Sequence, residues 1–189
     1  MHVLTRQKNV VIKASMALSL LFMNGMSAAQ EKPPLHYENW GVCPFECCTY
    51  RDWTAEEKIP VHRGRDERSP VVFQLQKDEQ VMALTGVVVT EKPIPVKINK
   101  TVKDGFIQKD EAPQLTLHSG DVVYFLTPLG EGYFKFWYRG NVYDSGDNLR
   151  AALPDHGVST MTWWKLVRNS QGNMGWTRSD KFNNVDACG

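Results

Sequence analysis

The segment from Trp163 to Thr177 constrains the fold more than any other part of the chain. Two short apolar runs rich in tryptophan, WWKLVR at residues 163–168 and MGWT at residues 174–177, flank the polar stretch NSQGN. Apolar runs of this length that are separated by Asn, Ser and Gly predict a β-hairpin. We therefore expect a protein that is built from antiparallel strands.

From residue 59 onward the chain repeats this pattern of short β-branched runs and turn residues. Such spacing is typical of an all-β domain. The run over residues 81–90 predicts a long strand with a bulge or bend at Gly86. Only residues 148–153 have helical character, and Pro154 should end that helix.

Residues 1–29 have the composition of a secretory signal peptide. Three basic residues precede a mostly apolar stretch over residues 14–26, which is too short to span a bilayer comfortably. Small residues follow it, ending in Ala28 and Ala29, as signal peptidase requires. We expect cleavage after Ala29 and a periplasmic or secreted location; the alternative is an N-terminal membrane anchor.

The charge of the remaining chain narrows the choice of partner. Cleavage would remove three of the 22 basic residues and none of the 21 acidic ones, which leaves a formal charge of −2. A balanced, slightly acidic surface argues against nucleic acid or an anionic membrane as the main partner. No run after residue 29 is long and apolar enough to span a membrane. We therefore expect no nucleic-acid partner and no membrane attachment after cleavage.

The four cysteines, Cys43, Cys47, Cys48 and Cys188, all lie after the expected cleavage site. An even number of cysteines in an exported chain predicts two disulfides. Because a bond between neighbouring Cys47 and Cys48 would close a strained ring, we expect Cys188 to pair with one of them and Cys43 with the other. The bridge to Cys188 would close a loop of about 140 residues, worth about 4–5 kcal/mol in the chain-entropy model.

Short segments of this chain resemble bacterial SH3-like (SH3b) domains. Residues 61–65, 68–72 and 75–77 are similar to the first strand, exposed loop and second strand of that family, and Gly172, Gly175 and Trp176 to its closing hairpin. Together the similar segments touch most of residues 59–182. Family members often have Gly where this chain has Asp78, whereas Gly120 in the second half fits the pattern.

An apparent repeat indicates how many such units the chain holds. Residues 75–85 (LQKDEQVMALT) align with residues 117–127 (LHSGDVVYFLT) at an offset of 42, with Glu79 opposite Asp121. Each stretch reads as an apolar residue, a tight polar turn and then a strand. A true repeat means two SH3-like units, and otherwise one barrel carries a long insertion.

The resemblance implies an all-β protein of SH3-like β-barrel architecture, with two tandem units and a disulfide-bearing N-terminal segment. After the signal peptide we expect an extended cysteine-bearing lead-in over residues 30–54, a first unit with its connector over residues 55–109, and a second unit with the closing hairpin over residues 110–189. The resemblance also implies non-enzymatic recognition outside the cytoplasm, of peptidoglycan, cell-wall peptide or an envelope protein.

Aromatic side chains are the candidate ligand contacts, because flat rings bind sugars and peptide side chains at little entropic cost. Successive strand residues face opposite sides, so one ring of Trp163 and Trp164, and one of Trp137 and Tyr138, should be exposed or lie between units. Two arginines on the first exposed loop would contact anions. The full candidate set is Tyr50, Trp53, Trp137, Tyr138, Trp163, Trp164, Arg63 and Arg65.

Two other functions compete with this interpretation. Cys47 or Cys48 could be the nucleophile of a small cysteine hydrolase, although no histidine of the chain lies in a recognisable catalytic motif. The second is a periplasmic protein-binding or inhibitory module. A zinc site is disfavoured because Cys-x3-Cys-Cys lacks the paired spacing of such sites. We expect no catalytic residue, no metal and no cofactor.

Overall fold

The computed structural model describes residues 32–33, 35–107, 112–153, 157 and 159–188. The expected signal peptide and Pro154 lie outside these residues. Within them strands predominate, which confirms the all-β prediction. The predicted helix is the single turn α1 (Asp147–Arg150). No helix in the described part of the chain has the length and apolar character that crossing a bilayer requires.

Fourteen strands are present in the described residues. In chain order they are β1 (Tyr37–Trp40), β2 (Asp52–Ala55), β3 (Ile59–His62), β4 (Val71–Leu75), β5 (Gln80–Lys92), β6 (Ile94–Lys97), β7 (Val102–Asp104), β8 (Leu115–Leu117), β9 (Val122–Gly130), β10 (Tyr133–Tyr138), β11 (Asn141–Asp144), β12 (Thr160–Arg168), β13 (Met174–Thr177) and β14 (Phe182–Asn183). The predicted hairpin is β12–β13, whose residues pair from Lys165 with Thr177 to Arg168 with Met174.

Eight strands form one curled, half-barrel sheet. Its order is β14-β2-β5-β12-β13-β3-β4, and β1 pairs with β5 beside this path. The long strand β5 is the centre of the sheet, because it pairs with β12 along one side and with β1 and β2 along the other. Trp53, Ile59, Leu75 and Val167 belong to the core that the curled sheet encloses.

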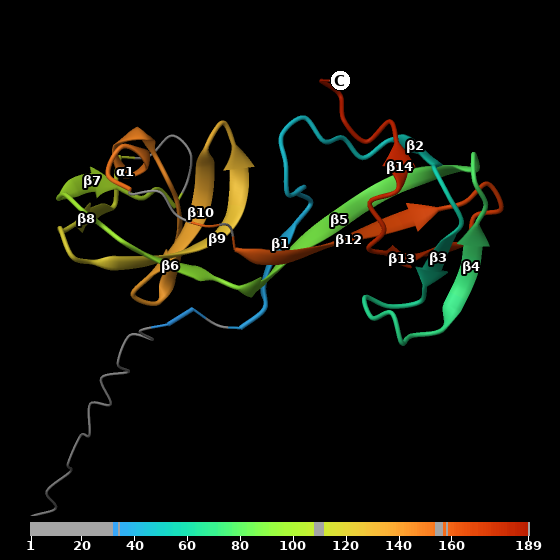
Figure 1. Ribbon diagram of the computed structural model, residues 1–189, viewed down its shortest axis with the longest axis horizontal. Helices are drawn as coiled ribbons and strands as arrows, with labels where there is room; N and C mark the ends of the chain where they lie inside the picture. The colour runs from blue at the N-terminus through green and yellow to red at the C-terminus, as the bar shows by residue number, and fades with distance from the viewer. Residues whose placement is uncertain (1–31, 34, 108–111, 154–156, 158, 189) are drawn as a thin grey trace, which may run out of the picture.

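A second β unit is inserted between β5 and β12. It consists of the sheet β11-β10-β9-β6, the pair β7-β8 and α1, and it has its own core around Phe136, Leu117 and Leu149. Figure 1 shows the two bodies at opposite ends of the molecule, joined by β5 and β12. The expected boundary between residues 109 and 110 therefore needs correction: β6 and β7 belong to the inserted unit, and the closing hairpin belongs to the first sheet.

The 42-residue offset corresponds to the same turn in each unit. Asp78 and Gly120 both adopt a positive φ, of 66° and 98°. In each turn the residue that follows, Glu79 or Asp121, uses its carboxylate to accept the backbone N–H three residues earlier at 2.9 Å. Asp tolerates the left-handed region better than most side chains, which explains how Asp78 replaces a glycine.

Gly86 does not form the predicted bulge. It pairs in register with Lys165, and the irregularities of the β5–β12 ladder lie elsewhere. A Cβ at this position would collide with the Tyr50 hydroxyl and lie 2.6 Å from Trp163 Nε1. Glycine is required here because two side chains approach the backbone closely.

The disulfides follow the expected scheme, with bonds between Cys43 and Cys48 and between Cys47 and Cys188. The C-terminal residues run antiparallel to the cysteine-bearing segment: Ala187 N–H donates to the Cys47 carbonyl at 2.8 Å, and Thr49 N–H to the Val185 carbonyl at 2.9 Å. Residues 43–48, which we name the disulfide loop, are thus fixed to the end of the first unit.

Candidate functional site

Most of the aromatic residues expected at the surface are buried. Five rings are at most 8% exposed: Trp53, Trp137, Tyr138, Trp163 and Trp164. Neither neighbouring pair therefore has the exposed ring that was one of the two alternatives predicted for it. The side chains do alternate, but both faces of each strand are covered.

Trp163 and Trp164 show how this occurs. Trp163 points into the main core, where its ring centroid lies 5.8 Å from that of Trp53. Trp164 points to the outer face of the same sheet and packs with Val87, Val89 and Trp176. The short strand β1 extends this face, because it pairs with β5 in the same sheet and its Trp40 ring packs against Trp176. We name Trp164, Val87, Val89 and Trp176 the outer-face cluster.

In the inserted unit Tyr138 faces the core, and Trp137 lies on the other side of β10 against Tyr124. The Tyr138 hydroxyl donates to the Asp121 carboxylate at 2.7 Å. Burial and this carboxylate together raise the pKa of Tyr138 to about 12. Its hydroxyl is already bonded within the protein.

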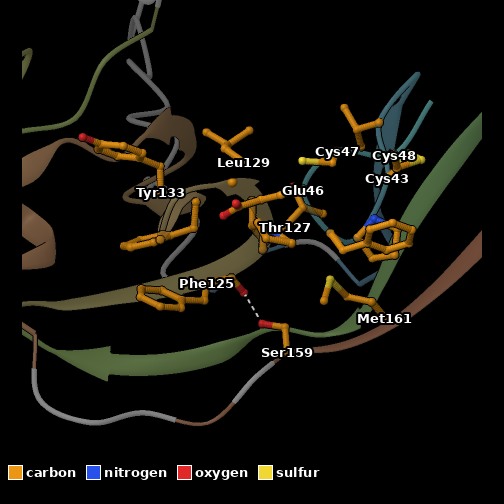
Figure 2. Close-up of a pocket in the computed structure, with 18 of the residues that line it drawn as sticks. Cys43, Glu46, Cys47, Cys48, Phe125, Thr127, Leu129, Tyr133, Ser159 and Met161 are labelled. Atoms are coloured by element: carbon orange, nitrogen blue, oxygen red, sulfur yellow. Dashed lines mark hydrogen bonds between the residues drawn. A yellow bond between two sulfur atoms is a disulfide. The ribbon is translucent and has the colours of Figure 1, made fainter. Parts of the chain in front are cut away.

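A cavity of about 740 Å³ opens between the disulfide loop and the β9–β10 hairpin of the inserted unit (Figure 2). We name it the interunit groove. One wall is formed by residues 41–48 with Tyr50, and the other by residues 125–130 and 132–134. Gly157, Ser159 and Met161, which lie before and within β12, complete the lining. Cavities of this volume accommodate small ligands and short peptide segments.

Several fixed contacts hold the two walls of the interunit groove in place. The Tyr50 hydroxyl donates to the Val42 carbonyl at 2.7 Å and accepts from Trp163 Nε1 at 3.0 Å. Across the groove, the Glu131 N–H donates to the Glu46 carboxylate. Because both disulfides also restrain the first wall, the cavity is formed before any ligand arrives.

The chemistry of the interunit groove changes along its length. Its central surface is mainly apolar, with Phe45, Phe125 and Leu129 among the lining side chains. An adjoining hollow of about 880 Å³ shares Glu46, Leu129 and Tyr133 with it. This hollow is lined by four carboxylates and by no lysine or arginine of the described chain: Glu46, Glu131, Asp144 and Asp147.

Three of these carboxylates have partners near the hollow. Glu46 accepts the Glu131 N–H, Asp144 pairs with Lys135 at 2.5 Å, and Asp147 lies 3.8 Å from Arg150. Asp147 also accepts the Tyr133 hydroxyl at 2.8 Å. The hydrogen bond with Asp147 is the largest cause of the raised pKa of Tyr133, and burial is the second. With more carboxylates than cations around it, this end of the groove favours a positively charged group.

Of the eight predicted ligand contacts, only Tyr50 lines the interunit groove. Arg63 is exposed on the loop after β3, and Arg65 pairs with Glu38 at 2.8 Å. Phe45 and Glu46 also line the groove, although neither is among the contacts predicted from the sequence. Their position between paired cysteines was a usable signal, because a short loop closed by a disulfide must expose its tip.

The cysteines offer no free thiol in the structure, since all four form disulfides. Cys47, Cys188 and Asp186 are close enough to share a metal ion, but the two sulfurs are bonded to each other and are not available as thiolates. The interunit groove is thus a pre-formed cavity with an apolar centre and an acidic end. Comparison with protein-family models, curated proteins and solved structures finds no match to this chain.

Proposed function

We propose that the protein is a non-enzymatic, extracytoplasmic binding module whose interunit groove receives a cell-wall peptide or a segment of an envelope protein. The observation that carries this proposal is the groove itself. It is pre-formed, has an apolar centre and ends among carboxylates. Such a surface suits a ligand that combines an apolar side chain with an ammonium or guanidinium group.

Cell-wall peptides that contain a diamino acid have this combination, as do basic segments of proteins. The apolar part would lie against Phe45 and Met161, which both line the cavity. The cation would lie near Glu46, whose carboxylate is held by the Glu131 N–H. Binding in this orientation requires little rearrangement of the protein.

The proposal includes an SH3-like architecture for the first unit. The sequence β3, exposed loop, β4, β5, β12–β13 hairpin and β14 is similar to the strand order of such barrels, with the inserted unit between β5 and β12. Export by the signal peptide and a periplasmic or secreted location belong to the same proposal. Two disulfides are consistent with an oxidising compartment.

A cysteine hydrolase using Cys47 or Cys48 would require these sulfurs in the thiolate form. In the structure each is bonded to a second sulfur, so neither can attack a substrate. Titration of thiols in the native protein separates the two functions. Two intact disulfides give no reactive thiol, whereas a hydrolase would give at least one.

The direct test is co-sedimentation of the oxidised protein with purified peptidoglycan, alongside capture of partners from an envelope extract. Phe45→Ala should weaken retention by about tenfold, because Phe45 lines the groove and is partly exposed. Met174→Ala is the matched control, since Met174 is an exposed apolar residue of β13 outside the groove. Equal retention of both variants, or none for the unaltered protein in either assay, would contradict the proposal.

A further inference from the structure

Trp40 is the most exposed tryptophan in the described chain, with 53% of its surface accessible. It ends β1, and its position is fixed by two charged neighbours. Its Nε1 donates to Glu38 Oε2 at 3.1 Å, and the guanidinium carbon of Arg65 lies 4.8 Å from the ring centroid. Arg65 in turn donates to Glu38 Oε1 at 2.8 Å.

These three residues form a closed set of contacts on the surface of the first unit. Glu38 bonds both of the others, one with each carboxylate oxygen. Beneath them, Trp176 packs edge-on against Trp40 with ring centroids 6.0 Å apart, and Arg65 lies 5.8 Å from the Trp176 ring. The indole of Trp40 is therefore held in one orientation while more than half of the residue stays open to a ligand.

The charge of this surface selects the kind of ligand. Glu38 and Arg65 neutralise each other. An anionic ligand would be repelled by the Glu38 carboxylate, and a cationic ligand by the Arg65 guanidinium. An apolar segment would bury the ion pair without replacing its hydrogen bonds to water, which is costly. A neutral ligand with hydroxyl groups avoids both penalties, since hydroxyls donate to a carboxylate and accept from a guanidinium.

The exposed ring adds a second requirement, a flat face of C–H groups that can lie against an indole. A pyranose ring has such a face and carries hydroxyls around its edge. We propose that Trp40, Glu38 and Arg65 form a binding site for the neutral pyranose rings of an oligosaccharide. Trp40 would stack on the pyranose with the face that Arg65 does not cover, and the Glu38–Arg65 pair would bond hydroxyls at the edge of the sugar.

This site is distinct from the interunit groove, because none of Glu38, Trp40 and Arg65 lines that cavity. The inference therefore does not depend on the peptide-binding function proposed above. The two surfaces are joined by Gly41, which follows Trp40 and lines the groove. A ligand with both sugar and peptide parts has one surface for each.

The test is a titration of the oxidised, isotope-labelled protein with chitotriose and with cellotriose, followed by NMR of the indole N–H signals. We expect a saturable shift of the Trp40 signal, assigned with Trp40→Phe, while the signal of buried Trp53 stays in place. Mannitol is the matched control ligand, because it has hydroxyls but no ring face. No saturable shift with either sugar up to about 10 mM, or an equal shift with mannitol, would overturn the proposal.

Two variants locate the sugar on the protein. Trp40→Ala also removes the ring that packs against Trp176, so Glu38→Gln, which keeps the side-chain shape, is the decisive variant. It should weaken sugar binding about tenfold, with an unchanged near-ultraviolet circular dichroism spectrum. Phe45→Ala in the groove should leave sugar binding unaltered. If instead Phe45→Ala weakens sugar binding and Glu38→Gln does not, the sugar binds in the groove and the proposal is wrong.

Discussion

The Tyr50 hydroxyl accepts a hydrogen bond from the Trp163 indole N–H at 3.0 Å, in the space that a side chain on Gly86 would occupy. This contact joins the segment that follows the disulfide loop to β12 across the backbone of β5. The same hydroxyl donates to Val42, which lines the interunit groove. Packing inside the first unit is thus connected to the wall of the candidate site.

Gly86→Ala should destabilise the protein by about 1–3 kcal/mol, because the added methyl group must displace Tyr50 or Trp163. It should also weaken ligand binding in the groove. The measurement is urea-induced unfolding followed by fluorescence. Gly64→Ala is the control, since the nearest atom to its added Cβ is 3.8 Å away, and its effect should stay within about 0.5 kcal/mol. Equal stability of the two variants would show that the close approach at Gly86 has no energetic consequence.

Asp104 joins separate segments of the inserted unit by hydrogen bonds, as Tyr50 does in the first unit. Its buried carboxylate accepts the backbone N–H groups of Gly105, Gly146 and Leu149 at 2.7, 2.6 and 2.8 Å. Asp104→Ala leaves these donors without an acceptor, and we expect a loss of about 3 kcal/mol or more in the free energy of unfolding. Asp52→Ala, at an exposed position of β2, should cost far less. Hydrogen exchange should show reduced protection of the backbone amides of α1 and β7. The prediction is wrong if these amides are as well protected as in the unaltered protein.

The pair of Tyr138 and Asp121 predicts a loss of stability at alkaline pH. The pKa of Tyr138 rises from 10.0 in the unfolded chain to about 12 in the folded protein, chiefly through burial and then through the Asp121 carboxylate. The folded state therefore holds the phenolic proton more tightly. The resulting stabilisation is complete below about pH 10 and disappears between about pH 10 and pH 12.

Tyr138→Phe removes this titrating group, so the variant should lose less stability than the unaltered protein over that alkaline range. Urea unfolding at a series of pH values provides the measurement. Tyr124→Phe is the control, because it removes a tyrosine hydroxyl from the other face of the sheet that contains Tyr138, beside Trp137. Parallel pH profiles for Tyr138→Phe and the unaltered protein would mean that another group is responsible.

The features that sequence predicted correctly are local, or depend on cysteine chemistry. The β12–β13 hairpin follows from its turn residues, and the exclusion of a bond between neighbouring cysteines left two possible pairings, one of which is observed. The turn shared by Glu79 and Asp121 was visible as a fixed offset. Each of these depends on residues whose relation can be stated without knowing the rest of the fold.

The sequence does not indicate which segments of the chain cover the two faces of each strand. Alternation placed Trp163, Lys165 and Val167 on one face, but a lysine there does not mark it as exposed. Lys165 is fully buried, and its ammonium group donates to the carbonyls of Arg178 and Ser179 at 3.0 and 2.8 Å. A buried charge with these acceptors cannot be distinguished from a surface lysine in the sequence alone.

A long insertion was one of the two alternatives, but the sequence did not locate it, for a related reason. The longest ladder of the first sheet joins β5 to β12, and the whole inserted unit separates these strands in the chain. When two paired strands lie so far apart in the chain, no pattern among neighbouring residues identifies them as partners. The interunit groove forms only because this unit folds back beside the disulfide loop, so its lining could not be assembled from motifs.

The two disulfides should contribute unequally to the stability of the protein. The loss of either one should weaken ligand binding in the interunit groove. Cys47 and Cys188 are 141 residues apart, and Cys43 and Cys48 are five apart. In the chain-entropy model the long-range bond contributes about 5 kcal/mol and the short one about 2 kcal/mol. The double variant Cys47→Ser/Cys188→Ser should therefore unfold at a clearly lower urea concentration than Cys43→Ser/Cys48→Ser.

Both double variants release part of the wall that carries Phe45 and Glu46, so both should weaken ligand binding in the interunit groove. Binding at Trp40 should persist in each, because β1 is held by its pairing with β5 and not by a disulfide. Calorimetric titration with a basic peptide and with chitotriose measures the two sites separately. Equal urea midpoints for the two variants would contradict the entropic account of the long-range bond. Undiminished peptide binding in both would show that the disulfide loop is not a wall of the binding site.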